Sequence, residues 1–552
     1  MTKRNALISV SDKENIVEFA KRLIALDFNV IASGGTAKLL ESSGVRVTST
    51  AEVINIYARD ILKKNNIKIT PEIEHSLGGA ILDHRVVTLS REIHGGILAR
   101  KDHMEELSKL MIPWIDLVCV DFYPFEKTIA KPGITMYEAI EQDDVGGPTM
   151  IHSAAKGAQE GRIVISDPKD RDIVLALLEQ SSDHDLTQEK KNELASKADY
   201  IVSRYCMMVS TYRSDRNFVG MFGEKVAACK YGENAHQTPA ALYSNGSNDP
   251  LALDQFVVVE GMLPSYNNYC DIYRMTQIAT HIAGAFDKNT KKVPFMAIGV
   301  KHGNPCGTAI GTNPKQVLKK MMSGDPLSIF GGLVMTNFPI DEKLVSELSG
   351  RMLDGIIAPA FSNDAIEKLK RKGNKCRFVV NKELSKLSIK SIDTAPYFRY
   401  VRGGFLEQPN YTFVIDLKAP EIKQYGKISQ SQKNDLLLAW AIGSTSNSNT
   451  ISIVKNGQLI GNGVGQQDRV GAAKLALERA KRSKHTLAGA SAFSDSFFPF
   501  PDAPEVLIKA GIKTILSTSG SVKDDLTITL CQKKGTGLIM IPDSLGRGFF
   551  GH

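Results

Sequence analysis

The sequence predicts an α/β protein with two domains. At 552 residues the chain is longer than one hydrophobic core supports, so more than one domain is expected. In residues 1–180, short apolar strands alternate with amphipathic helices, a pattern typical of a parallel sheet covered by helices. The second half also mixes strands and helices, and its length favours two subdomains. We place the junction in the polar stretch 213–229.

The elements of the first domain can be placed in order. Residues 5–10 read as a strand, Ser11 as a helix N-cap, and residues 16–24 as one apolar helical face. The elements expected after these are a strand at 29–32, a turn at 33–36, a helix at 37–42, a strand at 115–122, a helix at 135–142 and a strand at 162–166. Ligands of parallel α/β sheets bind at the carboxyl ends of the strands. Ser9, Ser11, Lys13 and Asp121 all fall at such ends.

The second half contains fewer clear signals. The polar segment 181–199 is expected to be a solvated helical face. The patterns after it predict a helix at 200–212, strands at 255–259 and 295–300, and a helix at 314–322. The sequence shows no internal repeat and no low-complexity tract.

Composition narrows the class of protein. The net charge is +8, but Lys and Arg are interspersed with Asp and Glu, so no nucleic-acid-binding arm is expected. The seven cysteines form no C-x-x-C pair, which favours free thiols in the cytoplasm over disulfides or a zinc site. We expect no membrane span, because no run of 18 apolar residues occurs.

Two glycine-containing turns suit a phosphorylated ligand. In Ser33-Gly34-Gly35-Thr36 the glycines let the backbone approach an anion, and the amides of the following helix point toward it. Lys13 would add a positive charge. Asp144-Val145-Gly146-Gly147 precedes a second helix in a similar way. A tight turn without a ligand remains the alternative for each.

Lys301 and His302 follow a predicted strand and enter a Gly-Asn-Pro turn. Such a pair can supply a cation and a base with a pKa near neutrality, although it could also be an ordinary surface pair. Pro305-Cys306 is superficially similar to the signature of zinc deaminases. That signature needs a second cysteine where Ala309 stands, so a metal-dependent deaminase is not expected.

Ordered motifs along the chain resemble one family. The matching segments are 8–13, 31–38, 94–100, 122–125, 144–147, 231–239, 301–307, 331–332 and 465–467. On these segments the chain resembles the bifunctional purine-biosynthesis enzymes that join AICAR formyltransferase to IMP cyclohydrolase. The resemblance implies a methylglyoxal-synthase-like cyclohydrolase domain at residues 1–215. It also implies a transformylase domain at 226–552, made of two cytidine-deaminase-like subdomains without zinc.

The resemblance also implies reactions and site residues. The transformylase would move a formyl group from 10-formyltetrahydrofolate to AICAR, and the cyclohydrolase would close formyl-AICAR to IMP, in a homodimer with transformylase sites between subunits. The implied catalytic residues are Lys301, His302 and Asn449 for formyl transfer, and Tyr123, Asp144 and Lys156 for ring closure. The implied binding residues are Ser11, Lys13, Ser33, Gly34, Gly35, Thr36, Arg85, Thr88, Gly146, Gly147, Lys230, Tyr231, His236, Asn268, Arg469, Phe497, Asp502 and His552. No metal ligand is implied.

Several positions depart from the family pattern. The family usually has Arg at Lys230 and often a basic residue at Pro501, and Val87 replaces a central Lys. The segment 57–74 is longer than expected. Two other interpretations therefore stay open: a monofunctional AICAR transformylase with an impaired cyclohydrolase domain, and a non-catalytic nucleotide-binding protein.

Overall fold

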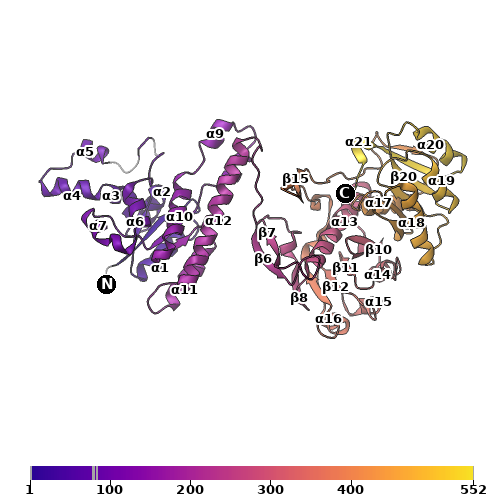
Figure 1. Cartoon of the computed structure of the whole chain (residues 1–552), viewed down its shortest axis with the longest axis horizontal. Coiled ribbons are helices and arrows are strands. Elements are labelled where there is room, and N and C mark those ends of the chain that lie inside the picture. Colours follow the sequence, from indigo (N-terminus) through magenta and orange to yellow (C-terminus); the bar gives the residue numbers. More distant parts are fainter. Residues whose placement is uncertain (1–2, 78–80, 83–84, 551–552) are drawn as a thin grey trace. The chain divides into compact units, whose positions relative to one another are not determined.

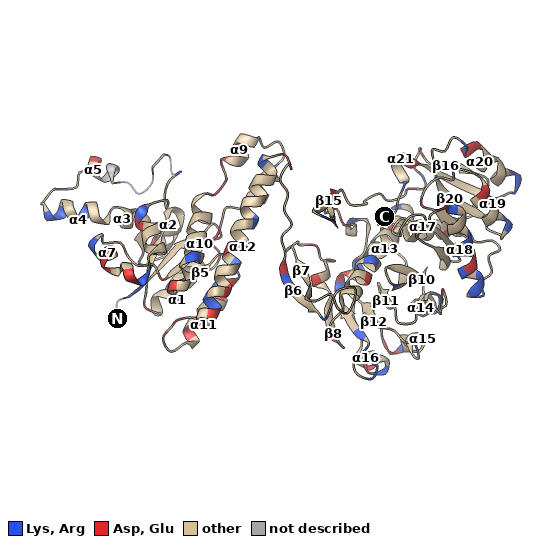
Figure 2. Ribbon diagram, viewed as in Figure 1, with Lys and Arg blue, Asp and Glu red and all other residues tan. Residues whose placement is uncertain are grey.

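The computed structural model describes residues 3–77, 81–82 and 85–550. The chain forms two compact units, Met1–Phe222 and Gly223–His552 (Figure 1). Among the described residues, no helix is long and apolar enough to cross a membrane. Lys and Arg are interspersed with Asp and Glu over both units (Figure 2).

The first unit is built on a five-stranded parallel sheet with the order β3-β2-β1-β4-β5. Its strands are β1 Arg4–Ser9, β2 Phe28–Ala32, β3 Thr48–Ser49, β4 Leu117–Val120 and β5 Ile163–Ile165. All residues of β4 and β5 are buried, so helices must cover both faces of the sheet. The predicted parallel α/β sheet is confirmed.

The helices of this unit pack in two groups. One group contains α1 (Ile16–Ala25), α2 (Gly34–Ser42) and α11 (Asp170–Gln180), and the other contains α6 (Arg91–Leu98), α10 (Gly146–Gly157) and α12 (Gln188–Arg213). The remaining helices are α3 Thr50–Ile54, α4 Ile56–Lys64, α5 Pro71–Ser76, α7 Met104–Lys109, α8 Phe125–Ile129 and α9 Met136–Ile140. The solvated helical face expected at 181–199 and the helix predicted at 200–212 form one helix, α12, which begins at Gln188 because the Thr187 hydroxyl accepts the Lys190 N–H.

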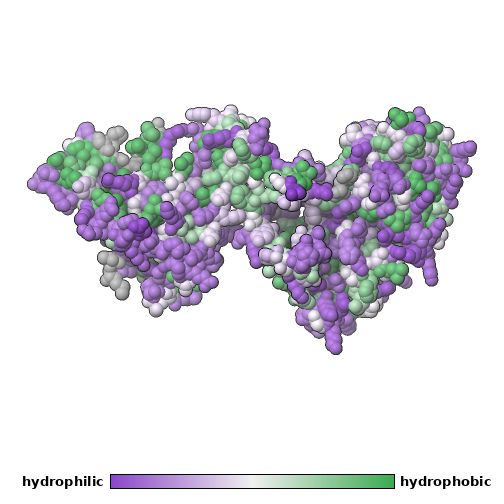
Figure 3. Space-filling model, viewed as in Figure 1, coloured by the Kyte–Doolittle hydropathy of each residue, from purple (hydrophilic) through white to green (hydrophobic). Residues whose placement is uncertain are grey.

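The long segment after β3 contains helices α4 and α5, which line a mainly apolar hollow. Helix α4 has no buried residue, and Tyr57 and Ile61 are 44% and 43% exposed. A hollow of about 460 Å³ between α4 and α5 is lined by Ala58, Ile61, Leu62, Glu72, Ile73 and Leu77. Figure 3 shows the hydrophobic surface over these two helices.

The second unit is built on a twelve-stranded mixed sheet with the order β16-β21-β20-β19-β17-β18-β10-β9-β11-β12-β13-β8. Its strands are β8 Val257–Glu260, β9 Phe295–Lys301, β10 Asn304–Gly311, β11 Leu333–Thr336, β12 Gly355–Ala358, β13 Arg377–Val380, β16 Lys423–Tyr425, β17 Ile451–Lys455, β18 Gln458–Gly463, β19 Ser491–Ser494, β20 Thr514–Ser519 and β21 Gly537–Pro542. Two hairpins, β6 Glu224–Cys229 with β7 Ala240–Ser244 and β14 Tyr397–Val401 with β15 Gly404–Gln408, lie outside it.

The topology of this unit repeats, although its sequence shows no repeat. Each half runs helix, antiparallel hairpin, helix, strand, helix, strand, helix, strand. The first half uses α13 Tyr266–Thr290, α14 Pro314–Met322, α15 Val345–Leu348 and α16 Asn363–Leu369; the second uses α17 Gln430–Gly443, α18 Arg469–Arg482, α19 Asp502–Lys509 and α20 Asp524–Lys533. The halves join where β10 pairs with β18, and α21 Asp543–Gly546 follows the last strand. The division of this unit into two subdomains stays a prediction, which the repeated topology supports.

The hydrophobic cores of this unit are arranged according to the same repeat. Helices α13 and α17 pack together and share one hydrophobic core with strands of both halves. A separate core under α14, α15 and α16 serves the first half, and another under α18 and α19 serves the second. The equivalent turns in the two halves are His302-Gly303 and Asn456-Gly457.

Candidate active sites

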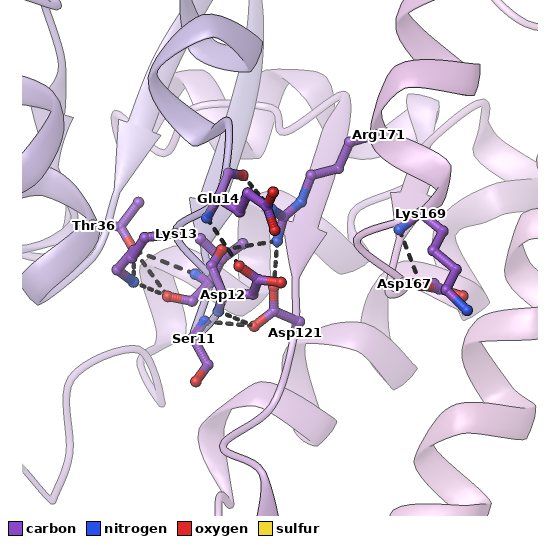
Figure 4. Close-up of polar contacts among 10 residues, drawn as sticks. Ser11, Asp12, Lys13, Glu14, Thr36, Asp121, Asp167, Lys169 and Arg171 are labelled. Atoms are coloured by element: carbon purple, nitrogen blue, oxygen red, sulfur yellow. Dashed lines mark hydrogen bonds and ion pairs between the residues drawn. The ribbon is translucent and has the colours of Figure 1, made fainter. Parts of the chain in front are cut away.

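Polar side chains of the first unit gather where β1, β2 and β4 end. Ser9 Oγ and Ser33 Oγ lie 2.5 Å apart, although 24 residues separate them in the sequence. Asp121, directly after β4, accepts hydrogen bonds from the backbone N–H groups of Ser11 and Asp12 at 2.5 and 2.9 Å (Figure 4). The strand order therefore brings together residues that the sequence predicted to lie at one edge.

The Ser33–Thr36 turn, which was expected to precede a helix at 37–42, is the N-cap and first turn of α2, and it has room for a ligand. Ser33 precedes α2 in an extended conformation, and its hydroxyl makes no cap to the helix. Gly34 has a φ of +38°, and apart from neighbouring residues and the adjoining backbone of α2, no atom lies within 4 Å of where a Cβ would stand on Gly34 or Gly35. The glycines thus allow the positive φ that the backbone adopts here, and they let a phosphate approach the backbone N–H groups closely.

Lys13 reaches the same turn from the loop after β1. Its Nζ donates to Thr36 Oγ1 at 2.9 Å and to the carbonyl of Val10 (Figure 4). Burial lowers the pKa of Lys13, while the nearby charge of Asp121 acts in the opposite direction. A cation thus lies beside the open glycines.

A second polar group lies at the start of α10. The Asp144 carboxylate accepts the Gly147 N–H at 2.8 Å, so this amide already has an anionic partner. The backbone N–H of Asp144 donates to the Tyr205 hydroxyl at 2.7 Å. Burial raises the pKa of Asp144. Thr88 is buried, and its Oγ1 lies 3.0 Å from where a Cβ would stand on Gly146.

The other residues implied for ring closure do not lie together at the start of α10. Tyr123 is 60% exposed, and it lies two residues after Asp121 in the sequence. Lys156 is exposed in the last turn of α10, about 15 Å along the helix from the Asp144 end. Arg85 forms an ion pair with Glu141. The structure therefore does not bring Lys156 to the end of α10 where Asp144 lies.

In the second unit, Lys301 and His302 lie at a tight hairpin. Lys301 pairs with Asn304, so β9 extends through Lys301 and the turn is His302-Gly303 rather than the expected Gly-Asn-Pro. His302 and Gly303 have φ angles of 54° and 70°, and such a two-residue turn with both φ positive matches the twist of the strands. Lys301 Nζ donates to the carbonyl of Phe330. His302 is exposed at the tip.

Asp271, which no sequence pattern singled out, holds this turn. Its Oδ1 accepts the Gly303 N–H at 2.6 Å, and Asp271 is only 7% exposed. Burial raises the pKa of Asp271, whereas the Gly303 hydrogen bond and the charge of His302 oppose that rise. In the second half, Asp435 on α17 accepts the N–H groups of Asn456 and Gly457 at 2.9 and 2.6 Å.

One face of α13 connects this hairpin to other segments. Asn268, Asp271 and Arg274 follow at three-residue spacing, so they share a face. Asn268 Oδ1 caps α13 by accepting the Ser265 N–H at 3.0 Å. Arg274 donates to the carbonyl of Thr445, to Asn447 Oδ1 at 3.1 Å and to the carbonyl of Phe550 at 3.1 Å.

Asn449 and Arg469 lie at the second half of this unit. Asn449 exchanges backbone hydrogen bonds with Gln466 at 3.0 and 3.1 Å, and its Nδ2 donates to the Gln466 carbonyl at 2.9 Å. Arg469 donates to Asp495 Oδ1 at 2.6 Å, and this carboxylate is fully buried. Burial raises the pKa of Asp495 and the Arg469 charge opposes the rise.

The remaining implied binding residues lie mostly on loops. Lys230 Nζ is 5.9 Å from the ring centroid of Tyr231, and His236 is exposed. Phe497 is half-buried, and the guanidinium carbon of Arg547 lies over its ring, 5.7 Å from the ring centroid. Asp502 begins α19 and accepts the Ala503 N–H at 2.8 Å. His552 lies outside the described residues.

Cys306 is buried in β10, with its Sγ 3.4 Å from the carbonyl of Gly299. Burial raises the pKa of its thiol to about 12. Within the part of the chain that the structure describes, no group of three His, Cys, Asp or Glu side chains could hold a metal ion.

These units define an α/β enzyme with a polar site in each unit, and comparisons identify its family. Residues 154–479 match the AICARFT/IMPCHase bienzyme family and residues 15–149 match the MGS-like domain. The chain belongs to the AICARFT/IMPCHase bienzyme family. The resemblance and the fold class predicted from the sequence are thereby confirmed.

Two relatives extend the match to nearly the whole chain. The "Bifunctional purine biosynthesis protein PurH" of Anoxybacillus flavithermus is 36% identical over 549 residues, which cover 97% of this chain and 98% of that protein. The protein of the same name from Bacillus cytotoxicus is 36% identical over 550 residues with the same coverage. A solved structure titled "Crystal structure of ForH" is 32% identical, covers 39% of this chain and 99% of its own, and has a TM-score of 0.31.

Proposed function

We propose that the two activities of the family divide between the two units. The chain is an AICAR formyltransferase and an IMP cyclohydrolase of purine biosynthesis, and its formyl donor is a folate. In our proposal residues 226–552 carry out formyl transfer and residues 1–215 carry out ring closure. The observation that carries this division is the Lys301-His302 hairpin, fixed by the buried carboxylate of Asp271 in the second unit.

Formyl transfer starts from a weak nucleophile. The 5-amino group of AICAR shares its lone pair with the imidazole and carboxamide, so a positioned base is needed. His302 accepts the amine proton as nitrogen attacks the formyl carbon of 10-formyltetrahydrofolate. Lys301 supports the negative charge and the departure of the folate nitrogen, which takes up a proton, and Asn449 orients the formyl or carboxamide oxygen. The products are formyl-AICAR and tetrahydrofolate.

Ring closure takes place at the polar edge of the first unit. Ser11, Lys13 and the Ser33–Thr36 turn hold the phosphate, and Arg85, Thr88, Gly146 and Gly147 complete the nucleotide site. The carboxamide nitrogen attacks the formyl carbon, and water leaves to give IMP. Tyr123 and Asp144 lie at the reacting centre in this proposal. Lys156 is proposed with them, although its place in the last turn of α10 requires a substrate that extends along that helix.

Other residues of the second unit bind substrate in this proposal: Lys230, Tyr231, His236, Asn268, Arg469, Phe497, Asp502 and His552. We further propose a homodimer whose transformylase sites lie between subunits, and formyl transfer without a catalytic metal, because Ala309 stands where a deaminase-type zinc site needs its second cysteine. Seven free cysteines agree with a reducing compartment such as the cytoplasm.

Two matched variants test the division of labour. His302→Ala should lose formyl transfer and still convert formyl-AICAR to IMP. Lys13→Ala should show the reverse, because its cation serves the first unit alone. Loss of both reactions in either variant, with folding intact, would refute the assignment of one reaction to each unit.

A further inference from the structure

Asp121 and Arg171 form a buried ion pair that the proposed chemistry does not use. Their side chains are 11% and 6% exposed, and an Arg171 nitrogen donates to Asp121 Oδ2. Asp121 follows β4, and Arg171 lies in the first turn of α11 (Figure 4). Burying two charges is costly, so such a pair invites a functional explanation.

The pair holds the backbone of the loop between β1 and α1. Asp121 Oδ1 accepts the N–H groups of Ser11 and Asp12, while Arg171 donates to the carbonyls of Asp12 and Glu14 at 3.1 and 3.2 Å. This loop also carries Lys13. Helix α1 itself begins without a side-chain cap. The conformation of the loop therefore depends on contacts from β4 and α11.

The two charges act on the phosphate site with opposite signs. Both Asp121 and Arg171 influence the charge of Lys13, the first favouring the cation and the second opposing it. Asp121 alone would repel a phosphate at the Ser33–Thr36 turn. Arg171 removes most of that repulsion by pairing with Asp121 Oδ2, and it leaves Asp121 Oδ1 to accept the N–H groups of Ser11 and Asp12.

We propose that the Asp121–Arg171 pair sets the affinity of the first unit for the nucleotide phosphate: Asp121 positions the Ser11–Lys13 loop, and Arg171 prevents the Asp121 charge from repelling the phosphate. The inference rests on the proposed function, because it requires a nucleotide at this edge. Both are positioning residues, and neither touches the reacting atoms.

Three variants distinguish this role from a purely structural one. Arg171→Met leaves an unpaired carboxylate, so the Kd for IMP and the KM for formyl-AICAR should rise about tenfold or more, with kcat changed little. Asp121→Asn keeps an oxygen for the Ser11 and Asp12 N–H groups and removes the negative charge, so IMP should bind as tightly as to wild type or more tightly. The double variant should return to within about threefold of the wild-type Kd.

The measurement is calorimetric titration of the full chain with IMP and, in parallel, with inosine, which lacks the phosphate. Formyl transfer in the second unit reports the concentration of active chain. Arg22→Met is the matched control, because Arg22 also pairs with a carboxylate of α11, Glu179, but on the surface. It should leave IMP binding unchanged.

The outcomes separate the inference from the proposed function. If Asp121→Asn and the double variant bind IMP at least tenfold more weakly than wild type, the pair is structural and the inference is wrong. This result refutes the inference even if the Arg171→Met single variant fails to fold. An Arg171→Met protein with wild-type affinity also refutes the inference, as does an equal loss for inosine and IMP. A wild-type chain that neither binds IMP nor closes the ring would refute the proposed function itself.

Discussion

Removal of the Asp271 carboxylate should slow formyl transfer. Asp271 holds the His302-Gly303 turn through one hydrogen bond of 2.6 Å to a backbone N–H, and it is nearly inaccessible to water. A hydrogen bond to a charged group contributes about 1.5–3 kcal/mol. If the lost hydrogen-bond energy is added in full to the activation free energy because His302 is misplaced, Asp271→Ala should lower kcat by about 10- to 150-fold.

Folate absorbance with saturating AICAR measures this effect. Asp271→Asn keeps an oxygen acceptor, so its kcat should fall by only about fivefold or less. Asp435→Ala is the matched control, since it removes the equivalent carboxylate from the Asn456-Gly457 turn in the second half. It should cost stability without changing kcat per folded enzyme. Equal rates for Asp271→Ala and wild type, or equal losses in the two alanine variants, would refute the reasoning.

Three further predictions concern single residues. His302→Ala should lower the rate of formyl transfer by about 10²–10⁴-fold while AICAR still binds in an equilibrium titration, and near-normal turnover would show that another group is the base. Val87→Lys should raise the rate of IMP formation from formyl-AICAR, by up to about 10²-fold, because Val87 offers no donor to the oxyanion; an unchanged rate would show that another cation serves. His281 is 5% exposed and burial lowers its pKa, so the unfolded chain takes up a proton that the folded one excludes. The free energy of unfolding should therefore be unaffected by His281 titration above pH 6.5. Below pH 6.5 it should decrease, by up to about 1.4 kcal/mol per pH unit. His281→Phe should flatten this slope in urea unfolding at pH 5.5 and 7.5; an equal slope would contradict the assignment.

The sequence predicted the parts of the site that local pattern determines. Ser9, Ser33 and Asp121 lie at the carboxyl ends of apolar strands, and the ends of parallel strands meet at one edge, so their proximity could be expected. Lys301 and His302 were found because a Lys-His pair after a strand has recognisable chemistry.

Residues whose role depends on distant contacts were missed. Arg171 reaches Asp121 across 50 positions, and Asp271 reaches Gly303 across 32. Helical periodicity can place Asp271 on the face of Arg274, but it cannot show that this face meets the β9–β10 hairpin. Two similar subdomains were expected from the length and the family resemblance alone, because a fold repeats through its hydrophobic pattern and needs no identical residues.

The central claim is that one chain carries out both reactions at separate sites. The most direct test supplies purified chain with formyl-AICAR and no folate, and follows IMP by chromatography. We predict IMP formation in wild type and in His302→Ala at similar rates. Absence of IMP in wild type, together with normal formyl transfer when AICAR and 10-formyltetrahydrofolate are supplied, would contradict the claim.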